Sequence, residues 1–322
     1  MNLKQIKEQL EVDVYRDMME DLFTEDLRKL QSMAWKMRKQ YFGEKIKFYT
    51  RPFEPVSVTG PNCELACKHC NKHYLGHMHW VENKKNIPKL FNMLAESEVN
   101  GVVLSGGSRK DGSVPTYEFA DAVKKAKKKT GLLVNAHTGI ITAEQAKKIT
   151  SFIDCALTDV IGDSGTVKDV LGLKYGPGDY RKTLRLLRLN GIRNLSPHVI
   201  VGLNKGKIKG ELKALSMLKE FDPDNIVIVV FIPTKGTKMA KVKPPKISDV
   251  AKIIAIARIM YPDKNISLSC VRPGGKYRDT LDAQAIKSGI NKLAVPSKSA
   301  HRQAKKQGLI VQEIKESRCC AW

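Results

Sequence analysis

The sequence lacks any run of the ~18 to 20 uninterrupted apolar residues that a membrane-spanning helix needs. Its first residues, MNLKQIKEQLEVD, carry too many charges for the apolar core of a secretory signal. It also has no internal repeat and no low-complexity linker. We therefore predict a cytoplasmic protein without a membrane partner.

Aromatic and acidic residues are scarce. Aromatics make up 7% of the chain, and 33 acidic residues stand against 56 basic ones, for a formal net charge of +23. Few aromatics argue against platforms for stacking nucleic-acid bases, and lysine groups such as 124-KKAKKK-129 belong to no recognisable nucleic-acid module. Nucleic acid is therefore an unfavoured partner, whereas an acidic protein or an anionic cofactor fits the positive field.

The pattern of apolar residues predicts an α/β fold. The segment from Leu3 to about Tyr41 has helical spacing, and a strand is expected over Val56–Thr59. Apolar β-rich runs then alternate with helical segments, at 101–107, 132–139, 153–163, 192–203, 226–233 and 266–273. Six or more such units favour a full or partial (β/α) barrel of the TIM type over an open sheet.

We expect three parts along the chain. These are an N-terminal helical extension (1–45), a (β/α) barrel core (46–275) and a C-terminal cap (276–322) that contains a helix, a short strand and another helix. In such a barrel the chemistry lies at the carboxyl ends of the strands.

Seven cysteines in a reducing compartment are unlikely to form structural disulfides, so clustered ones indicate metal ligands. Three of them, Cys63, Cys67 and Cys70 in 63-CELACKHC-70, follow the expected strand directly. Three thiolates on one loop can hold three irons of a cubane and leave the fourth iron open. A structural zinc is the alternative, with a fourth ligand from a nearby histidine, namely His69, His73, His77 or His79.

The CxxxCxxC spacing after the first strand resembles the radical S-adenosylmethionine superfamily, over residues 47 to about 270. The resemblance implies that S-adenosylmethionine chelates the open iron of a 4Fe-4S cluster and is cleaved, by one electron, to methionine and a 5'-deoxyadenosyl radical. It further implies cofactor contacts from residues at later strand ends, namely Ser105, Gly106, Gly107, Ser108, His137, Asp159, Asp163, Ile200 and Gly202.

Three of these positions, and His69 of the cysteine loop, carry a qualification. Ser108 replaces the acid usual after the family's glycine pair, and His69 replaces the usual aromatic before the third cysteine. Asp163 can instead cap the following helix, and Gly202 can simply serve a turn.

A longer match, which includes 58-VTGPNCELACKHCNKHYLGHM-78 and 270-CVRPGGKYRDTLDAQAIKSGINKLAVPS-297, resembles the biotin synthase-like archaeal proteins that include the two-component lipoyl synthases. This resemblance implies sulfur insertion at unactivated C-H positions of an acyl chain, with a second iron-sulfur cluster as the sulfur source. The substrate would be a small molecule or an acyl chain on a carrier protein. A ferredoxin or flavodoxin-like electron donor and a homologous partner subunit are also implied.

A second cluster needs further ligands. We expect them from Cys270 and from Cys319 and Cys320, whose tail can fold back as a lid. Cys155 is expected to be a buried small hydrophobe. Arg272, Arg318 or a serine could supply a non-cysteine ligand.

Other functions stay open at this point. The chain could be a radical enzyme that acts on a different substrate without sulfur insertion, and would then need no second cluster. It could also be a zinc-stabilised basic protein that binds nucleic acid. Radical modification of RNA ranks below both, because no RNA-binding module is evident.

Overall fold

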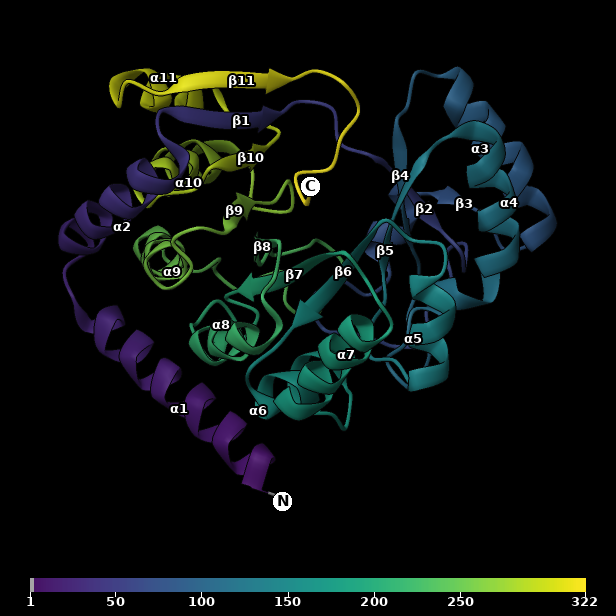
Figure 1. The fold of residues 1–322 in the computed structure, drawn as a ribbon, viewed down its shortest axis with the longest axis horizontal. Helices are drawn as coiled ribbons and strands as arrows, with labels where there is room; N and C mark the ends of the chain where they lie inside the picture. Colours follow the sequence, from purple (N-terminus) through teal and green to yellow (C-terminus); the bar gives the residue numbers. More distant parts are fainter. Residues whose placement is uncertain (1–2) are drawn as a thin grey trace.

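Two helices precede the first strand, as the spacing of apolar residues predicts. The computed structural model describes residues 3–322, with side chains from Leu10 onward. Helix α1 (Leu3–Thr24) packs on α8 (Glu211–Leu218), and α2 (Leu27–Phe42) packs on α9 (Ile247–Met260) (Figure 1). Helix α2 begins at Asp26, whose carboxylate accepts the backbone N–H of Arg28 at 2.8 Å. None of the described helices is long and apolar enough to cross a bilayer.

Eleven parallel strands form one curled sheet in the order β11-β1-β10-β9-β8-β7-β6-β5-β4-β2-β3 (Figure 1). Because β11 and β3 are free edges, the sheet is a partial barrel, which confirms the predicted fold class. The strands are β1 (Lys45–Tyr49), β2 (Glu54–Ser57), β3 (His79–Trp80), β4 (Gly101–Ser105), β5 (Leu133–His137), β6 (Cys155–Val160), β7 (Asn194–Val201), β8 (Asn225–Val230), β9 (Asn265–Leu268), β10 (Lys292–Ala294) and β11 (Ile310–Ile314).

The remaining helices follow the strands and lie around the outside of the curled sheet (Figure 1). They are α3 (Ile87–Glu96), α4 (Ala120–Thr130), α5 (Ala143–Thr150), α6 (Ser164–Thr166), α7 (Pro177–Leu189), α10 (Gly275–Lys287) and α11 (Lys298–Lys306). A π-helical turn (Val167–Leu171) continues α6, and short 3-10 helices occupy His73–His77, Lys84–Asn86, Pro115–Phe119 and Lys219–Phe221.

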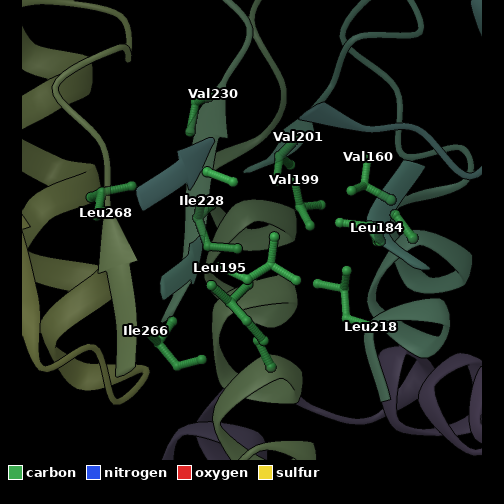
Figure 2. Close-up of a cluster of buried hydrophobic side chains, with 14 of the residues drawn as sticks. Val160, Leu184, Leu195, Val199, Val201, Leu218, Ile228, Val230, Ile266 and Leu268 are labelled. Carbon is green, nitrogen blue, oxygen red and sulfur yellow. The ribbon is translucent and has the colours of Figure 1, made fainter. Parts of the chain in front are cut away.

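Alternation along the strands separates a packed outer face from an inner face. On β6, Ala156 and Val160 belong to the main core, whereas Cys155 and Leu157 belong to a separate interior cluster. Figure 2 shows the outer core, where β6 to β9 pack on α7 and α8 through residues such as Leu184. The inner face is therefore left for other contacts.

Two boundaries differ from those expected. The strand predicted over Val56–Thr59 covers Glu54–Ser57 instead, because the Ser57 hydroxyl donates to the Gly60 carbonyl at 2.7 Å and closes a turn. The segment 276–322, expected as a cap, contributes β10 and β11 to the same sheet. Strand β1 lies between these two, so the ends of the chain meet in the sheet. The division into three parts otherwise stays a prediction.

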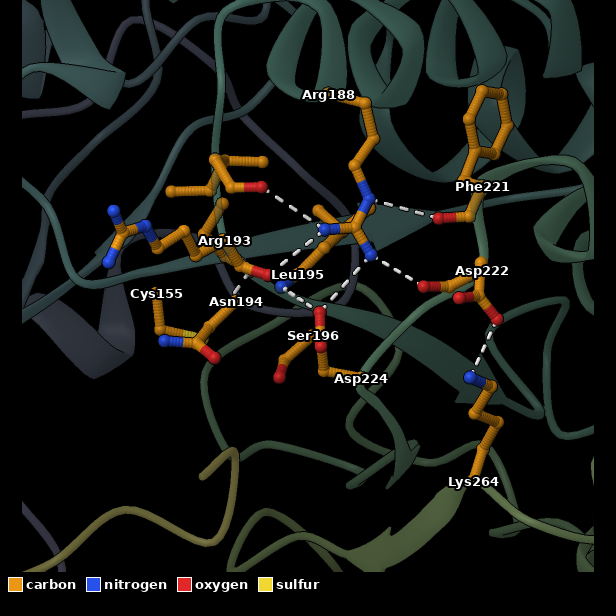
Figure 3. Close-up of polar contacts among 12 residues, drawn as sticks. Cys155, Arg188, Arg193, Asn194, Leu195, Ser196, Phe221, Asp222, Asp224 and Lys264 are labelled. Atoms are coloured by element: carbon orange, nitrogen blue, oxygen red, sulfur yellow. Dashed lines mark hydrogen bonds and ion pairs between the residues drawn. The ribbon is translucent and has the colours of Figure 1, made fainter.

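A half-buried arginine ties the amino-terminal ends of β7 and β8 to α7. Arg188 donates to the carbonyls of Ile192 at 3.1 Å and Phe221 at 3.0 Å, and to the Asp224 carboxylate at 3.1 Å (Figure 3). Asp224 also accepts the backbone N–H of Leu195 at 2.9 Å. These contacts fix where two adjacent strands begin.

Replacing Arg188 with alanine should lower the free energy of unfolding by about 2 kcal/mol, because the Asp224 carboxylate and several carbonyls lose their shared donor. Chemical denaturation of the variant measures this. The control is Arg193→Ala, whose exposed side chain makes no hydrogen bond among the described residues, and which should stay within about 0.5 kcal/mol of wild type. Equal losses of unfolding free energy in the two variants would contradict this stabilising role of Arg188.

Candidate functional site

The cysteine loop begins directly after β2 and is held by three neighbouring segments. The backbone N–H of Glu64 donates to the Ser108 carbonyl at 2.9 Å, and that of Lys68 donates to the Val170 carbonyl at 2.8 Å. The backbone N–H of Met239 in turn donates to the Lys68 carbonyl at 3.1 Å. The loop is therefore fixed at the carboxyl ends of the strands, where the sequence predicts it.

The loop brings together two of the three predicted cysteines and one histidine. The ligand atoms of Cys67, His69 and Cys70 all lie within 4.8 Å of one another. A hydrogen bond from the Cys67 thiol lowers the pKa of Cys70, and the Nδ1 atom of His69, which is itself buried, has no partner among the described residues. Cys63 stands apart from this group, with its Sγ atom 3.7 Å from the Ser108 carbonyl.

The predicted 105-SGGS-108 motif packs directly on this loop. The backbone N–H of Gly107 donates to the Thr59 hydroxyl at 2.7 Å. A Cβ atom at Gly107 would lie 2.0 Å from the Asn62 carbonyl oxygen and 2.5 Å from the Cys63 Cα atom. Glycine is therefore required at this position by the close approach of the two backbones.

Replacing Gly107 with alanine should displace the segment around Cys63, because backbone atoms fill the space of the added methyl group. We expect loss of metal from the cysteine loop while the fold survives. Metal analysis together with circular dichroism measures both. Gly178→Ala is the matched control, because nothing lies within 4 Å of the position that its methyl group would take. Metal retained in full by Gly107→Ala would contradict this role.

Three ionisable residues from adjacent strands face the inside of the barrel near the loop. Asp159 of β6 lies in register with His198 of β7, and the rings of His198 and His137 of β5 have centroids 5.4 Å apart. Burial lowers the pKa of His137, and it lowers that of His198 to about 3. Asp159 faces open interior space yet is surrounded by protein, and this loss of hydration raises its pKa.

Two other predicted cofactor residues have visible structural roles. The Asp163 carboxylate accepts the backbone N–H and the hydroxyl of Thr166, both at 2.7 Å, and so caps α6. Gly202 turns the chain after β7 with φ +81°, and its N–H donates to the Glu211 carboxylate at 2.8 Å. Ile200 is half-buried two residues after His198. For these three positions, cofactor contact stays a prediction.

The C-terminal tail enters the barrel instead of covering it as a lid. Strand residues of the inner face bind its carbonyl groups: Ser196 donates to Ala321 at 2.7 Å, and Ser267 donates to Cys320 at 2.9 Å. Asn225 also donates to the Cys320 carbonyl at 3.2 Å. Figure 1 shows the chain end inside the curled sheet.

The last residue, Trp322, is held inside the barrel by three further side chains. Its indole N–H donates to the Asn135 side chain at 2.9 Å. Its carbonyl oxygen accepts hydrogen bonds from Tyr49, at 3.3 Å, and from Lys292. Burial lowers the pKa of Lys292 to about 8.

This tail places the four remaining cysteines in one interior region. Cys319 packs against the cluster that contains Cys155, and Cys320 packs in a second cluster beside Cys270. Cys155 is buried, as predicted, and burial raises the pKa of its thiol to about 12. It nevertheless lies on the inner face, next to the tail.

Of the two arginines suggested as non-cysteine ligands, Arg272 is already bound to other groups, and a ligand role for Arg318 stays a prediction. Arg272 is fully buried and forms an ion pair with Asp282, at 2.7 Å, while its other nitrogens donate to backbone carbonyls such as that of Ala294 at 2.9 Å. We therefore discard Arg272 as a ligand, because its donors are already used. The backbone of exposed Arg318 bonds to the Arg51 carbonyl.

Comparisons with known proteins agree with this geometry. The family model of the Biotin and Thiamin Synthesis associated domain matches residues 227–316. Biotin synthase of Methanococcus aeolicus is 26% identical over 191 residues, which cover 58% of this chain and 56% of that protein. Biotin synthase of Clostridium acetobutylicum is 21% identical over 280 residues, which cover 84% of this chain and 82% of that protein.

Two solved structures share the fold. Methylornithine synthase (PylB) aligns over 95% of this chain and 97% of its own, with a TM-score of 0.66 and 17% identity. The hydrogenase maturase HydG aligns over 95% of this chain and 75% of its own, with a TM-score of 0.66 and 17% identity. The chain is therefore similar in sequence to biotin synthases and shares its fold with these two solved structures. Its match to the Methanococcus relative spans just over half of that relative's length.

The residues of the loop fit the iron-sulfur cluster and S-adenosylmethionine that the sequence resemblance implies. Cys67 and Cys70 offer soft thiolate ligands on a loop above the inner face, and Cys63 belongs to the same loop. Gly107 has no Cβ atom, so the cysteine loop can lie directly against the segment that follows β4. The unpartnered Nδ1 atom of His69 is a polar group that a bound ligand can satisfy.

Sequence reasoning missed several residues of the inner face. His198 was seen only as part of a strand, and the residues that anchor the tail were not singled out; these are Tyr49, Asn135, Ser196, Asn225, Ser267 and Lys292. The sequence did contain a signal for these residues. Asn135 and His137 are two residues apart in an otherwise apolar strand, and so are Ser196 and His198. This spacing places each pair on one face of its strand.

Proposed function

We propose that this protein binds a 4Fe-4S cluster and S-adenosylmethionine at the cysteine loop and inserts sulfur at an unactivated C-H position of an acyl chain, with a second iron-sulfur cluster inside the barrel. When bound, these groups supply a carbon-centred radical that removes a hydrogen atom, and a sulfide that replaces it. The observation that carries the proposal is the tail, which gathers Cys319 and Cys320 with Cys155 and Cys270 on the inner face.

The chain's own residues would prepare the interior for this reaction. Cys63, Cys67 and Cys70 would hold the first metal site at the mouth, and the strands would shield the space below it from bulk water. The lowered pKa values of His137 and His198 keep both rings neutral near pH 7, so they can hydrogen-bond a substrate without burying a charge.

The test is metal and sulfide per chain after anaerobic purification, followed by mass spectrometry of an acyl chain offered as the free acid and as an amide on a carrier peptide. About eight irons and a gain of sulfur in one acyl product support the proposal. About four irons with cleavage of S-adenosylmethionine but no sulfur gain would favour a radical enzyme acting on another substrate. Zinc in place of iron would overturn the proposal.

A further inference from the structure

A lysine-rich hollow lies beside the cysteine loop on its outer side. It has a volume of about 390 Å³, and three lysines and one aspartate are among its lining residues. Lys68 comes from the cysteine loop, Lys168 from the π-helical turn, and Lys238 from the segment that follows β8. We call these residues, together with Asp169, the lysine hollow.

The charge of the lysine hollow is strongly unbalanced. Asp169 is already paired with Lys68 at 2.5 Å and with Lys205 at 2.9 Å. Lys168 and Lys238 are exposed, and among the side chains and backbone described from residue 10 onward neither ammonium group has a hydrogen bond or an ion pair. The two free ammonium groups and the concave shape suit an acidic protein surface.

The lysine hollow is close to the predicted iron site. Its lining includes Ala66 and Lys68, the two neighbours of Cys67 in the chain. It also includes Val170, whose carbonyl accepts the Lys68 N–H at 2.8 Å, while the next carbonyl, of Leu171, lies 3.7 Å from the Cys67 Sγ atom. A partner seated here would be separated from Cys67 by little more than one layer of backbone, and electron tunnelling falls steeply with distance.

The hollow is separate from the interior where an acyl chain would react. None of its lining residues is an inner-face residue such as Asp159, His198 or Cys319. A carrier domain docked here would contact none of these interior residues. The position therefore favours a partner that delivers an electron over one that delivers a substrate.

We propose that the lysine hollow docks an acidic, ferredoxin-type one-electron donor. This inference rests on the proposed function, because it requires an iron site at Cys67. In the docked pair the ferredoxin is oxidised by one electron, the iron site is reduced by one, and no bond forms or breaks at the surface.

The test measures binding of a reduced plant-type [2Fe-2S] ferredoxin to the metal-loaded protein by anaerobic calorimetry at low salt. The variant K168E/K238E should weaken binding about tenfold. The control K124E/K128E carries the same change of charge on two exposed lysines of α4, and it should weaken binding less than about twofold. Raising the salt concentration should weaken wild-type binding in the same direction.

Several results would overturn the docking proposal. These are equal weakening in both variants, no binding of the ferredoxin by wild type, or weakened binding of an acidic carrier domain with ferredoxin binding unchanged. Chemical reduction with dithionite bypasses any docking surface. If dithionite-reduced wild type fails to cleave S-adenosylmethionine, the proposed function fails, whatever the binding experiment shows.

Discussion

Replacing Cys67 with alanine should abolish iron binding at the cysteine loop and bring cleavage of S-adenosylmethionine below detection, whereas replacing His69 with phenylalanine should preserve both. Both residues belong to the one tight ligand group found among the described residues. A cubane that uses Cys63, Cys67 and Cys70 needs every thiol and no histidine. Phenylalanine also restores the aromatic side chain that is usual in the family at position 69.

The pair of variants separates iron from zinc. A tetrahedral zinc held by Cys67, His69 and Cys70 would lose affinity in either variant, because each removes one of its ligands. Iron, zinc and sulfide analysis of the two purified variants, with 5'-deoxyadenosine measured by chromatography, decides the matter. Loss of metal from the phenylalanine variant as well as from the alanine variant would contradict the radical interpretation of this loop.

The sequence predicted this loop because its evidence is local. The three cysteines lie within eight consecutive residues, directly after a short apolar strand, so their proximity follows from chain connectivity alone. The same holds for the βα units, whose strands read as largely apolar runs because helices cover one face of the sheet and the curl of the sheet encloses the other. Even here, the spacing did not predict that Cys63 lies outside the tight group formed by Cys67, His69 and Cys70.

Pairing between distant segments could not be predicted in this way. Strand β1 follows the N-terminal helices, yet it pairs with β10 and β11 from the other end of the chain. Its outer residues Ile46 and Phe48 are buried, while Lys45 and Lys47 are exposed, and this pattern suits an edge strand as well as a central one. The alternation of apolar residues predicts which face of a strand is buried, but it does not predict which strands pair with it.

The tail was harder still, because its anchors are single polar residues on different strands. Ser196, Asn225 and Ser267 each read as an ordinary interruption of an apolar strand. Only the curling of the sheet places their side chains around the carbonyls of Cys320 and Ala321. The structure thus explains why polar groups stand on an inner face that barrels commonly fill with apolar side chains.

Replacing Cys319 and Cys320 together with alanine should lower iron from about eight to about four per chain and abolish sulfur insertion, while cleavage of S-adenosylmethionine continues. Ser196, Asn225 and Ser267 bind carbonyl oxygens of the tail, so the backbone of this variant keeps these anchors, although Asn135 loses its contact with the Cys319 thiol. The substitution therefore tests the thiols separately from the position of the tail.

The complementary variant keeps both thiols and releases the tail. Asn225→Ala with Ser267→Ala removes the two hydrogen bonds to the Cys320 carbonyl, so we expect partial loss of the second set of irons. Trp322→Phe, which removes only the indole bond to Asn135, serves as a milder control. If the double alanine variant at 319 and 320 retains all its iron, the tail is a structural plug, and the sulfur donor cannot be assigned to it. If it loses iron while the anchor variants lose it in proportion to the bonds removed, the tail acts as the arm that carries ligands into the barrel.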